Sequence, residues 1–435
     1  MQNHLLDYEE FFNRASLFGH QALALLNGEE VITYHELPTA EEGRRLLSNA
    51  TPEIRKERQK LFFNPAIEAR QRLGQGKHDR GEAMVFADMQ IEERDRMGLN
   101  NHLPLHVKSV SVLRKTVKAG ETWDVSVRGE IWRLDDLEEL YTTVNVGELI
   151  LEPGARVIVR GNVFSMLCQR VIHRTHPDMD NDYQIGILPT PFSVDLKNGA
   201  HDGADGENGL HGSNGENGIT LRTENSFLGK RLQEDVEQHA LDGKHGTSGL
   251  QGTDGKPGRN GGMCKLAELT FRHIEGSLHV YAQAGQGGNG GNGGNGGNGG
   301  NGGKGTDGCI HITGILNGGN GGNAGDGGNA GRGGNAGNGG LASNIYIITA
   351  AGQDNCISTT AIDSLPGEAG NGGIGGKAGS PGEAGNGPQH GMPGQTAKNG
   401  AHGAHGKQGR QRPAPWMYVN EKPVRQSVQL TSIAS

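Results

Sequence analysis

Hydrophobic residues recur at helical spacing near the start of the chain. After Asp7, a residue type that often caps helices, apolar side chains follow at Tyr8, Phe11, Ala15 and Phe18. Asn27-Gly28 is a typical helix end. The pattern therefore predicts one helix between these two signals.

Further helix starts follow within the first hundred residues. Thr39 and Glu42 have the spacing of a capping box, and Thr51-Pro52 and Asn64-Pro65 each place Pro at a first helical position. A last helix would run from Gly81 to Gly98. These short amphipathic helices have charged faces, so they form either a solvated helical domain packed on its neighbour or an attachment to a larger assembly.

From Leu105 to Ile172 the hydrophobic period changes to two, which is typical of β-strands. Single glycines, which suit turns, separate the alternating pairs. The pairs are Val110/Val112, Val125/Val127, Val144/Val146, Leu149/Leu151 and Val157/Val159, and the glycines are Gly120, Gly129, Gly147, Gly154 and Gly161. We expect a β-sandwich or a short β-solenoid here.

A third pattern, glycine at every third residue, fills the second half. Gly-Gly-Asn repeats five times from Gly287 to Asn301, and Lys304 takes the next Asn position. This period fits polyproline II helices, which have three residues per turn and rise about 3.1 Å per residue. An isolated helix of this kind has no internal hydrogen bonds, but positions without side chains allow several to pack closely. We expect a bundle within one chain.

The same period recurs in four other blocks, at 203–218, 243–261, 319–340 and 367–409, the last interrupted at Pro388 and Ala397. The Asn side chains either face solvent or bond to neighbouring backbone, and we favour the structural role. The glycines and asparagines expected to hold this register include Gly288, Asn289, Gly291, Asn292, Gly294, Asn295, Gly319, Gly322 and Gly325.

Two other interpretations of the glycine pattern are less favoured. Collagen requires abundant Pro in its triplets, and Pro is nearly absent between Gly199 and Leu365. A flexible Gly-rich linker would not keep registered spacing. Short alternating strands between the blocks also argue against a linker, since Leu278 to Gln286 is similar to Ile345 to Gln353, and Ile310 to Gly314 is similar to the start of both.

These patterns together predict a multidomain protein with an N-terminal helical region, a central all-β sandwich or short solenoid, and a C-terminal bundle of polyproline II helices connected by short β-strands. The expected boundaries are 1–103 for the helical domain, 104–198 for the β domain, 199–410 for the bundle and 411–435 for a tail.

The Gly-rich half resembles two known families. The stretch from Val280 to Ile312, a strand that runs into glycine repeats and closes on Gly302-Gly303-Lys304-Gly305-Thr306-Asp307-Gly308, is similar to the N-terminal domain of Obg-type GTPases. No Gly-Lys pair is followed by Ser or Thr, so the phosphate-binding loop of a GTPase is absent. Several glycine arrays interleaved with other segments also resemble the adhesin at the tip of T-even-type phage tail fibres. That resemblance implies receptor binding through the exposed connecting segments.

Length and charge set limits on the partners. The 435 residues carry a formal net charge of −8, which argues against nucleic acid or an anionic membrane as the main partner. The sequence has no transmembrane span, and Met1-Gln2-Asn3-His4 lacks the pattern of a signal peptide. We expect a protein made in the cytoplasm that stays there or reaches a virion or the extracellular space after release. The four cysteines, which include no Cys-x-x-Cys pair, are best interpreted as small buried residues.

Candidate metal ligands are sparse. Five histidines directly precede a glycine of the register, namely His211, His245, His390, His402 and His405. His402 and His405 are weak candidates for a Zn²⁺ or Ni²⁺ site, although surface polar residues are the simpler interpretation. Asp307 ends a stretch that fits one Ca²⁺-binding repeat of the β-roll type, but such sites need several stacked repeats. We predict no cofactor, with Ca²⁺ or Zn²⁺ as the alternatives.

Two functions fit these observations. The first is a non-enzymatic structural and recognition protein, a rigid spike that binds a cell-surface glycan or protein through loops at 224–241, 353–366 and 388–395. The second is a toxin or enzyme with its activity in residues 1–190 and the Gly-rich half as scaffold. No catalytic set is legible in the sequence, which favours the first. The residues expected to contact the receptor are Tyr281, Tyr346, His390, Met392, Trp416 and Tyr418.

Overall fold

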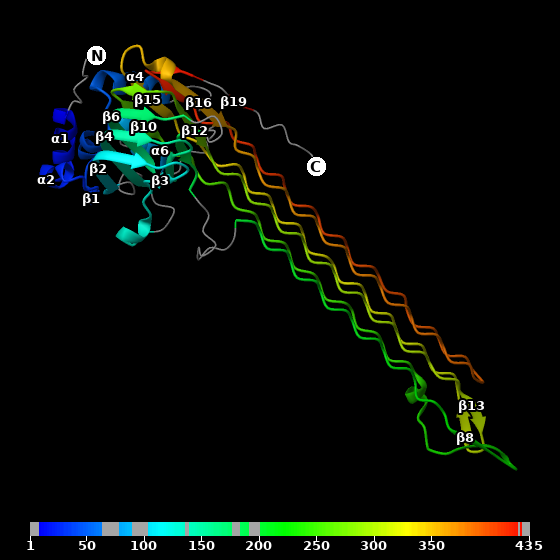
Figure 1. Ribbon diagram of the computed structural model, residues 1–435. Helices are drawn as coiled ribbons and strands as arrows, with labels where there is room; N and C mark the ends of the chain where they lie inside the picture. Colours follow the sequence, from blue (N-terminus) through cyan, green and yellow to red (C-terminus); the bar gives the residue numbers. More distant parts are fainter. Residues whose placement is uncertain are drawn as a thin grey trace.

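The protein consists of a body and a long stalk (Figure 1). The computed structural model describes residues 8–62, 78–88, 103–134, 139–175, 183–190, 201–424 and 427–428. The body contains the helices and both large sheets, and the Gly-rich segments leave it side by side to form the stalk. The helix starts expected at Pro65 and the helix end expected at Gly98 lie outside the described residues.

One side of the body is a nine-stranded mixed sheet. Strands β2, β4, β6, β10, β15 and β17 run parallel, while β1 and β18 are antiparallel at the two ends and β11 also pairs with β6. Their bounds are β1 (Val31–Leu37), β2 (Leu105–Val117), β4 (Leu140–Leu151), β6 (Val163–His173), β10 (Ala267–Phe271), β11 (Ile274–Glu275), β15 (Ile345–Thr349), β17 (Met417–Val419) and β18 (Lys422–Pro423).

The second sheet is entirely parallel and faces the first. It contains β3 (Thr122–Asp124), β5 (Arg156–Arg160), β7 (Ile185–Leu188), β12 (Leu278–Gln283), β16 (Ile357–Ile362) and β19 (Ser427–Val428). The chain alternates between the sheets, from β2 to β3, β4 to β5, β6 to β7, β10 to β12, β15 to β16 and β17 to β19. The body is therefore wound as successive coils, each of which adds one strand to each sheet.

Alternating apolar residues fill the space between the two sheets. Val144, Val146, Val157 and Val159 are all at most 1% exposed and belong to one continuous core that includes residues of both sheets. Burying a Val side chain of this kind contributes roughly 1.5–3 kcal/mol. The turn glycine Gly154 has a φ of +74°, a backbone conformation that side chains disfavour. The period of two in the sequence thus arises from this core.

Helices cover the outer face of the nine-stranded sheet. They are α1 (Tyr8–Leu17), α2 (Ala22–Leu26), α3 (Ala40–Leu47), α4 (Pro52–Phe62) and α6 (His78–Phe86). Phe18, Leu47 and Phe86 pack there against Tyr141 and Tyr346 of the sheet. The single helix expected before Gly28 is interrupted, because Gly19 adopts a φ of +76° between α1 and α2. The capping box is confirmed in part, since Thr39 accepts a hydrogen bond from the Glu42 amide.

Three excursions from successive coils make the stalk. After β7, β12 and β16 the chain runs out from the body and returns to β10, β15 and β17. We number the six segments in chain order: segments 1 (203–218), 3 (285–308) and 5 (366–387) run outward, and segments 2 (243–262), 4 (318–340) and 6 (391–410) return. The outward segments form one layer of the stalk and the return segments form the other, because parallel coils place each excursion beside the preceding one.

Backbone hydrogen bonds join every neighbouring pair of segments at intervals of three residues. Gly209 donates to the Asn295 carbonyl of the parallel segment 3 at 2.8 Å, and Leu250 donates to the Leu210 carbonyl of the antiparallel segment 1 at 2.8 Å. A Cβ atom built on Gly297 would lie 1.9 Å from the Leu210 carbonyl oxygen, so the segments approach more closely than a side chain at that position allows. These close contacts recur at every third residue, which explains why glycine recurs with the same period in the sequence.

The predicted fold class is wrong. The chain does not form a helical region, an all-β domain and a C-terminal polyproline II bundle in succession. Strands from the second half, β10, β12, β15 and β16, pair with β6, β7 and one another in the same two sheets as the first half, and the helices cover one of those sheets. The result is an α/β body with a large mixed sheet and a parallel sheet. Local periodicity could not reveal this arrangement, because parallel partners are far apart in sequence.

Candidate recognition surface at the distal tip

Two β-hairpins lie at the free end of the stalk (Figure 1). The first joins β8 (Thr223–Ser226) to β9 (Gly229–Leu232), and the second joins β13 (Cys309–His311) to β14 (Gly314–Leu316). A short 3₁₀-helix, η4 (Gln238–Leu241), leads from the first hairpin back into segment 2. The tip is thus made of the connections between outward and return segments.

The first hairpin exposes two large apolar side chains at its turn. Ser226 pairs with Gly229, so Phe227 and Leu228 are the two turn residues, and they are 103% and 78% exposed. The positive φ of this turn is at Gly229, at +126°, so Phe227 and Leu228 do not adopt backbone conformations that side chains disfavour. Their apolar side chains nevertheless bury little of their surface. Exposed apolar clusters mark interaction sites.

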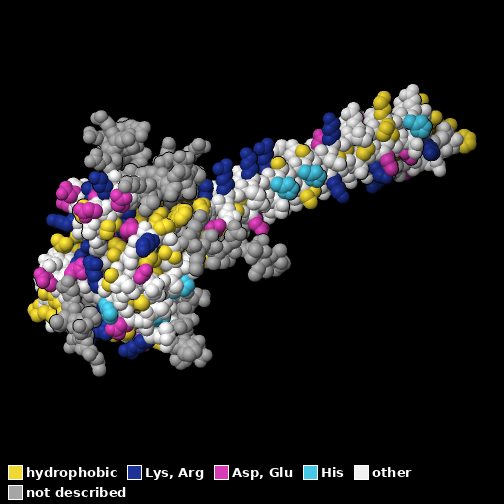
Figure 2. Space-filling model, turned by 90° about the horizontal axis from the view of Figure 1, so that it is seen from above, with side chains coloured by type: hydrophobic (Ala, Val, Ile, Leu, Met, Phe, Trp, Pro, Cys, Tyr) yellow, Lys and Arg dark blue, Asp and Glu magenta, His cyan; other side chains and the backbone are white. Residues whose placement is uncertain are grey.

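The second hairpin extends the apolar surface. Ile310, Ile312 and Ile315 are 65%, 45% and 61% exposed, and Ile310 lies opposite Ile315 on the two strands. The Ile312 amide donates to the Lys230 carbonyl at 3.0 Å, which joins the two hairpins. We call the five side chains Phe227, Leu228, Ile310, Ile312 and Ile315 the apolar tip. Figure 2 shows hydrophobic side chains gathered at the free end of the stalk.

Two of the residues expected to contact a receptor lie near this end. Met392 is 75% exposed on segment 6, and its amide donates to the Asn320 side chain at the distal end of segment 4. His390 is exposed in the turn between segments 5 and 6. The loops expected at 224–241 and 388–395 therefore both belong to the distal part of the stalk, whereas 353–366 lies in the body, where it contains all of β16.

The other four expected contact residues lie in the body. Tyr346 is fully buried and Tyr418 is 4% exposed, both beneath the helices, where their rings stack 5.2 Å apart. Trp416 is half-buried against the same cluster, and the half-buried Tyr281 stacks on Tyr183. Tyr346 and Tyr418 present no surface to a receptor, which corrects their assignment. Aromatic side chains favour both interfaces and cores, so their presence in the sequence does not distinguish the two environments.

The asparagine column makes contacts with the backbone of neighbouring segments. The side chains of Asn289, Asn292 and Asn295 accept hydrogen bonds from the amides of Glu368, Asn371 and Ile374 in segment 5, at 2.8 to 2.9 Å. The glycines beside them, Gly288, Gly291 and Gly294, donate to carbonyls of segment 2, and Gly319, Gly322 and Gly325 donate to carbonyls of segment 3. Side-chain amides and backbone thus share the hydrogen bonding between segments.

Three of the histidines in the register play the same role as asparagine. The Nδ1 atoms of His211, His245 and His402 accept hydrogen bonds from the amides of Asn298, Asn323 and Gly375 at 2.8, 2.8 and 3.2 Å. Asp307, the calcium candidate, likewise accepts from the Asn386 amide at 2.7 Å, and His405 is exposed. Within the part of the chain that the structure describes, no group of three or more His, Cys, Asp and Glu side chains could hold a metal ion.

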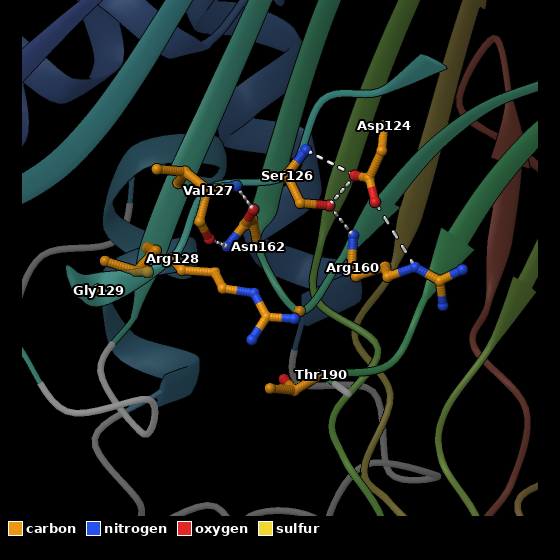
Figure 3. A pocket seen from close by; sticks show the side chains of 10 residues that line it. Asp124, Ser126, Val127, Arg128, Gly129, Arg160, Asn162 and Thr190 are labelled. Carbon is orange, nitrogen blue, oxygen red and sulfur yellow. Dashed lines mark hydrogen bonds and ion pairs between the residues drawn. The ribbon is translucent and has the colours of Figure 1, made fainter. Parts of the chain in front are cut away.

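A small pocket lies in the body, where its lining includes residues of β3 and β5 and Thr190 (Figure 3). Its volume is about 70 Å³, and its lining includes the exposed Arg128 and Arg160 beside Asp124, Ser126 and Thr190. Pockets that enclose drug-sized ligands have roughly 300–1,000 Å³. This pocket is therefore suited to a few waters or a small ion.

Hydrogen bonds within the pocket wall engage its hydroxyl and carboxylate groups. The Ser126 hydroxyl donates to Asp124 and accepts from the Arg160 amide, while Asp124 and Arg160 form an ion pair at 3.7 Å (Figure 3). Asn162 binds both the amide and the carbonyl of Val127, at 2.7 and 2.9 Å. No imidazole is among the ten lining residues, so this wall holds no Ser–His arrangement of the kind that activates a nucleophile.

Among the described residues, no helix is long and apolar enough to cross a membrane. Comparisons with protein-family models, with curated proteins and with solved structures found no match to this chain.

Proposed function

We propose that this chain is a non-enzymatic recognition protein that presents a binding surface, the apolar tip, at the end of a rigid stalk. Its target is a component of a cell surface. The observation that carries the proposal is the complete exposure of Phe227 in the turn of the β8–β9 hairpin, which lies at the free end of the stalk. An apolar side chain placed there stabilises nothing within the protein, and exposed apolar clusters mark interaction sites.

The hydrogen bonding of the stalk supports the role of a rigid spacer. In the triplet 296–298 all three backbone amides are engaged: Gly296 donates to Ile374, Gly297 donates to Leu250, and Asn298 donates to the His211 side chain. These bonds connect segment 3 to segments 5, 2 and 1. Bending the stalk would have to break such bonds in several segments at once, so the tip is held at a fixed distance from the body.

The resemblance of the glycine arrays to phage tail-fibre adhesins points in the same direction. The resemblance implies that the connecting segments, and not the glycine arrays, bind the receptor. The connecting segments of this chain at the far end of the stalk include the two hairpins with the apolar tip. The helices on the body are then free to serve the other expected role, attachment to a larger assembly.

Binding of the full chain to whole cells tests the proposal. The fluorescently labelled protein is mixed with bacterial or insect cells, and the double variant Phe227→Ser/Leu228→Ser is compared with Leu250→Ser, which changes a residue 58% exposed on the side of the stalk. We expect the tip variant to lose at least about tenfold in binding, because each removed side chain contributes 1.5–3 kcal/mol when buried, and the stalk variant to bind normally. Equal binding by all three proteins would exclude the apolar tip as the recognition surface.

A toxin or enzyme with its activity in residues 1–190 is the second candidate. The pocket near Arg128 and Arg160 is the feature of the described body that favours it. The double variant Arg128→Ala/Arg160→Ala separates the two functions, because it leaves the tip unchanged. Cell killing or hydrolytic activity that disappears in this variant, while the tip variant remains active, would favour the second candidate.

A further inference from the structure

We propose that the apolar tip docks on a lipid bilayer that carries anionic headgroups, with Phe227 and Leu228 entering the interface. This inference rests on the proposed recognition role of the tip and names its target. It also revises the expectation, drawn from the net charge of −8, that an anionic membrane is not the main partner. The net charge averages over the whole chain, whereas docking depends on the few residues at the point of contact.

The shape of the apolar tip fits a bilayer. Phe227 and Leu228 project from a two-residue turn, and residues 222 to 231 around them are all exposed. A protein partner must supply a matching pocket for such a projection, but a bilayer accepts it without one. Ile312 lies directly behind the turn, since a Cβ atom on Gly229 would lie 3.8 Å from its side chain. Deeper insertion would therefore bring further apolar surface into the interface.

The charges of the first hairpin complement an anionic surface. Arg222, Lys230 and Arg231 are exposed cations next to the turn, and Glu224 is the carboxylate among residues 222–233. The Glu224 carboxylate accepts a hydrogen bond from the Gln233 side chain at 2.7 Å. The hairpin thus carries two net positive charges, in a chain whose overall charge is negative. Long cationic side chains beside an inserted apolar pair can reach the headgroups.

The acidic residues of the tip lie on the return path. Glu234, Asp235 and Glu237 follow β9 and precede η4, which leads into segment 2. The chain returns toward the stalk in this stretch (Figure 1). The hairpin apex therefore meets a surface before these carboxylates do.

Co-sedimentation of the full chain with vesicles tests the proposal. One set of vesicles contains phosphatidylcholine and roughly one phosphatidylglycerol in three lipids, and the other contains phosphatidylcholine alone. We expect stronger binding to the anionic vesicles and a steep loss of binding with added salt, because salt screens charges over about 8–10 Å at ordinary ionic strength. Lys230→Gln/Arg231→Gln should weaken binding to anionic vesicles by roughly fivefold per charge. Phe227→Ser/Leu228→Ser should abolish binding to both.

The control variant Leu250→Ser should behave as the unchanged protein does. Binding that is indifferent to lipid charge, or that survives in Phe227→Ser/Leu228→Ser, would overturn the proposal. So would a failure to bind either set of vesicles. If vesicles are not bound but cells are, and cell binding still depends on Phe227 and Leu228, the tip recognises a protein or glycan, and the proposed function survives without the lipid.

Discussion

At the scale of single residues, the stalk depends on small polar side chains that accept hydrogen bonds from backbone amides. His211 belongs to a column of such acceptors in segment 1. In this column the side chains of Asp205, Asn208 and Asn214 accept hydrogen bonds from the backbone amides of Asn292, Asn295 and Asn301. The ring nitrogen of histidine and the side-chain oxygen of asparagine occupy equivalent positions. The same acceptor role accounts for three of the five histidines in the register, His211, His245 and His402.

This equivalence predicts the effect of two substitutions at His211. His211→Asn should leave stability nearly unchanged, since it restores the acceptor used elsewhere in the column. His211→Ala should cost about 1 kcal/mol, because the Asn298 amide loses its partner. Hydrogen exchange followed by mass spectrometry on the peptide that contains Asn298 checks both variants. Equal exchange in His211→Asn and His211→Ala would mean that the side-chain acceptor does not protect this amide.

A second prediction at this scale concerns acid sensitivity of the body. Burial and the neighbouring His35 lower the pKa of His20 to about 4. The Thr33 hydroxyl donates to the Phe18 carbonyl, so the His20 Nε2 atom, 2.9 Å from it, must donate to Thr33. Nδ1 of His20 is buried and has no hydrogen-bond partner, so a proton there would be buried unpaired. The folded body therefore favours the neutral ring.

The sign of the pH dependence follows from this shift. Between pH 4 and the ordinary pKa of 6.5, the unfolded state binds more protons at this site than the folded state does. The contribution of His20 to stability is therefore complete above pH 6.5 and declines as the pH falls toward 4. Urea denaturation across this range, compared with His20→Gln, isolates the effect. A stability difference between the two proteins that does not change with pH would contradict the prediction.

At the scale of elements, a buried ion network fastens helix α4 to the sheet. Arg58 on α4 is fully buried, forms ion pairs with Glu268 of β10 and with Glu421 at 2.7 Å, and lies 3.9 Å above the Tyr346 ring of β15. Glu268 is also fully buried and accepts from the Asn49 amide. The network thus joins the N-terminal helices to strands more than 200 residues away.

Arg58→Met should destabilise the protein by about 3–5 kcal/mol, because it leaves the Glu268 carboxylate buried without a cation. Arg58→Met/Glu268→Gln removes the stranded charge, so the double variant should recover much of that loss. Urea denaturation measures both. If the double variant is no more stable than the single variant, the cost lies in lost packing rather than in an unpaired charge.

The sequence located several elements but not their partners. The strands expected at Leu278 to Gln286 and Ile345 to Gln353 contain β12 and β15. The alternation was legible in β12, which buries one side chain in two, and β15, which is buried at four of its five positions, was legible from its similarity to β12. The pairing of Ala267 with Phe164 and Ile345 was not, since each such contact spans a complete excursion into the stalk. The exposure of Phe227 was equally hidden, because an apolar residue in sequence is normally assigned to a core.

At the scale of the whole molecule, the coils of the body determine how the segments of the stalk are arranged. The parallel coils bring the three excursions side by side, and the period of three lets segments from successive coils bond in register over their length. Both ends of each segment are fixed. The strands of the body hold one end, and at the other end the Ile312 amide holds the two hairpins together through Lys230. The length of the stalk should therefore change only if all six segments change together.

This linkage predicts the result of a matched deletion. Removing one triplet at the same level of every segment preserves each remaining pair in register, for example Gly206 with Asn292 and Gly212 with Asn298. The deleted residues would be 209–211, 249–251, 295–297, 328–330, 376–378 and 400–402. The protein should fold with a melting temperature close to that of the full chain, and solution X-ray scattering should report a maximum dimension shorter by at most about 10 Å, the reach of three extended residues.

Deleting only residues 295–297 provides the contrast. Segment 3 would then be one triplet shorter than its neighbours between two fixed ends, so it must break its bonds to segments 1, 2, 4 and 5 or pull β13 away from β9. We expect this protein to melt at a lower temperature than the six-deletion variant, although it has lost fewer residues, and to show faster amide exchange at the tip. The opposite order of stability would mean that the segments slide independently, and the tip would then not be held at a fixed distance from the body.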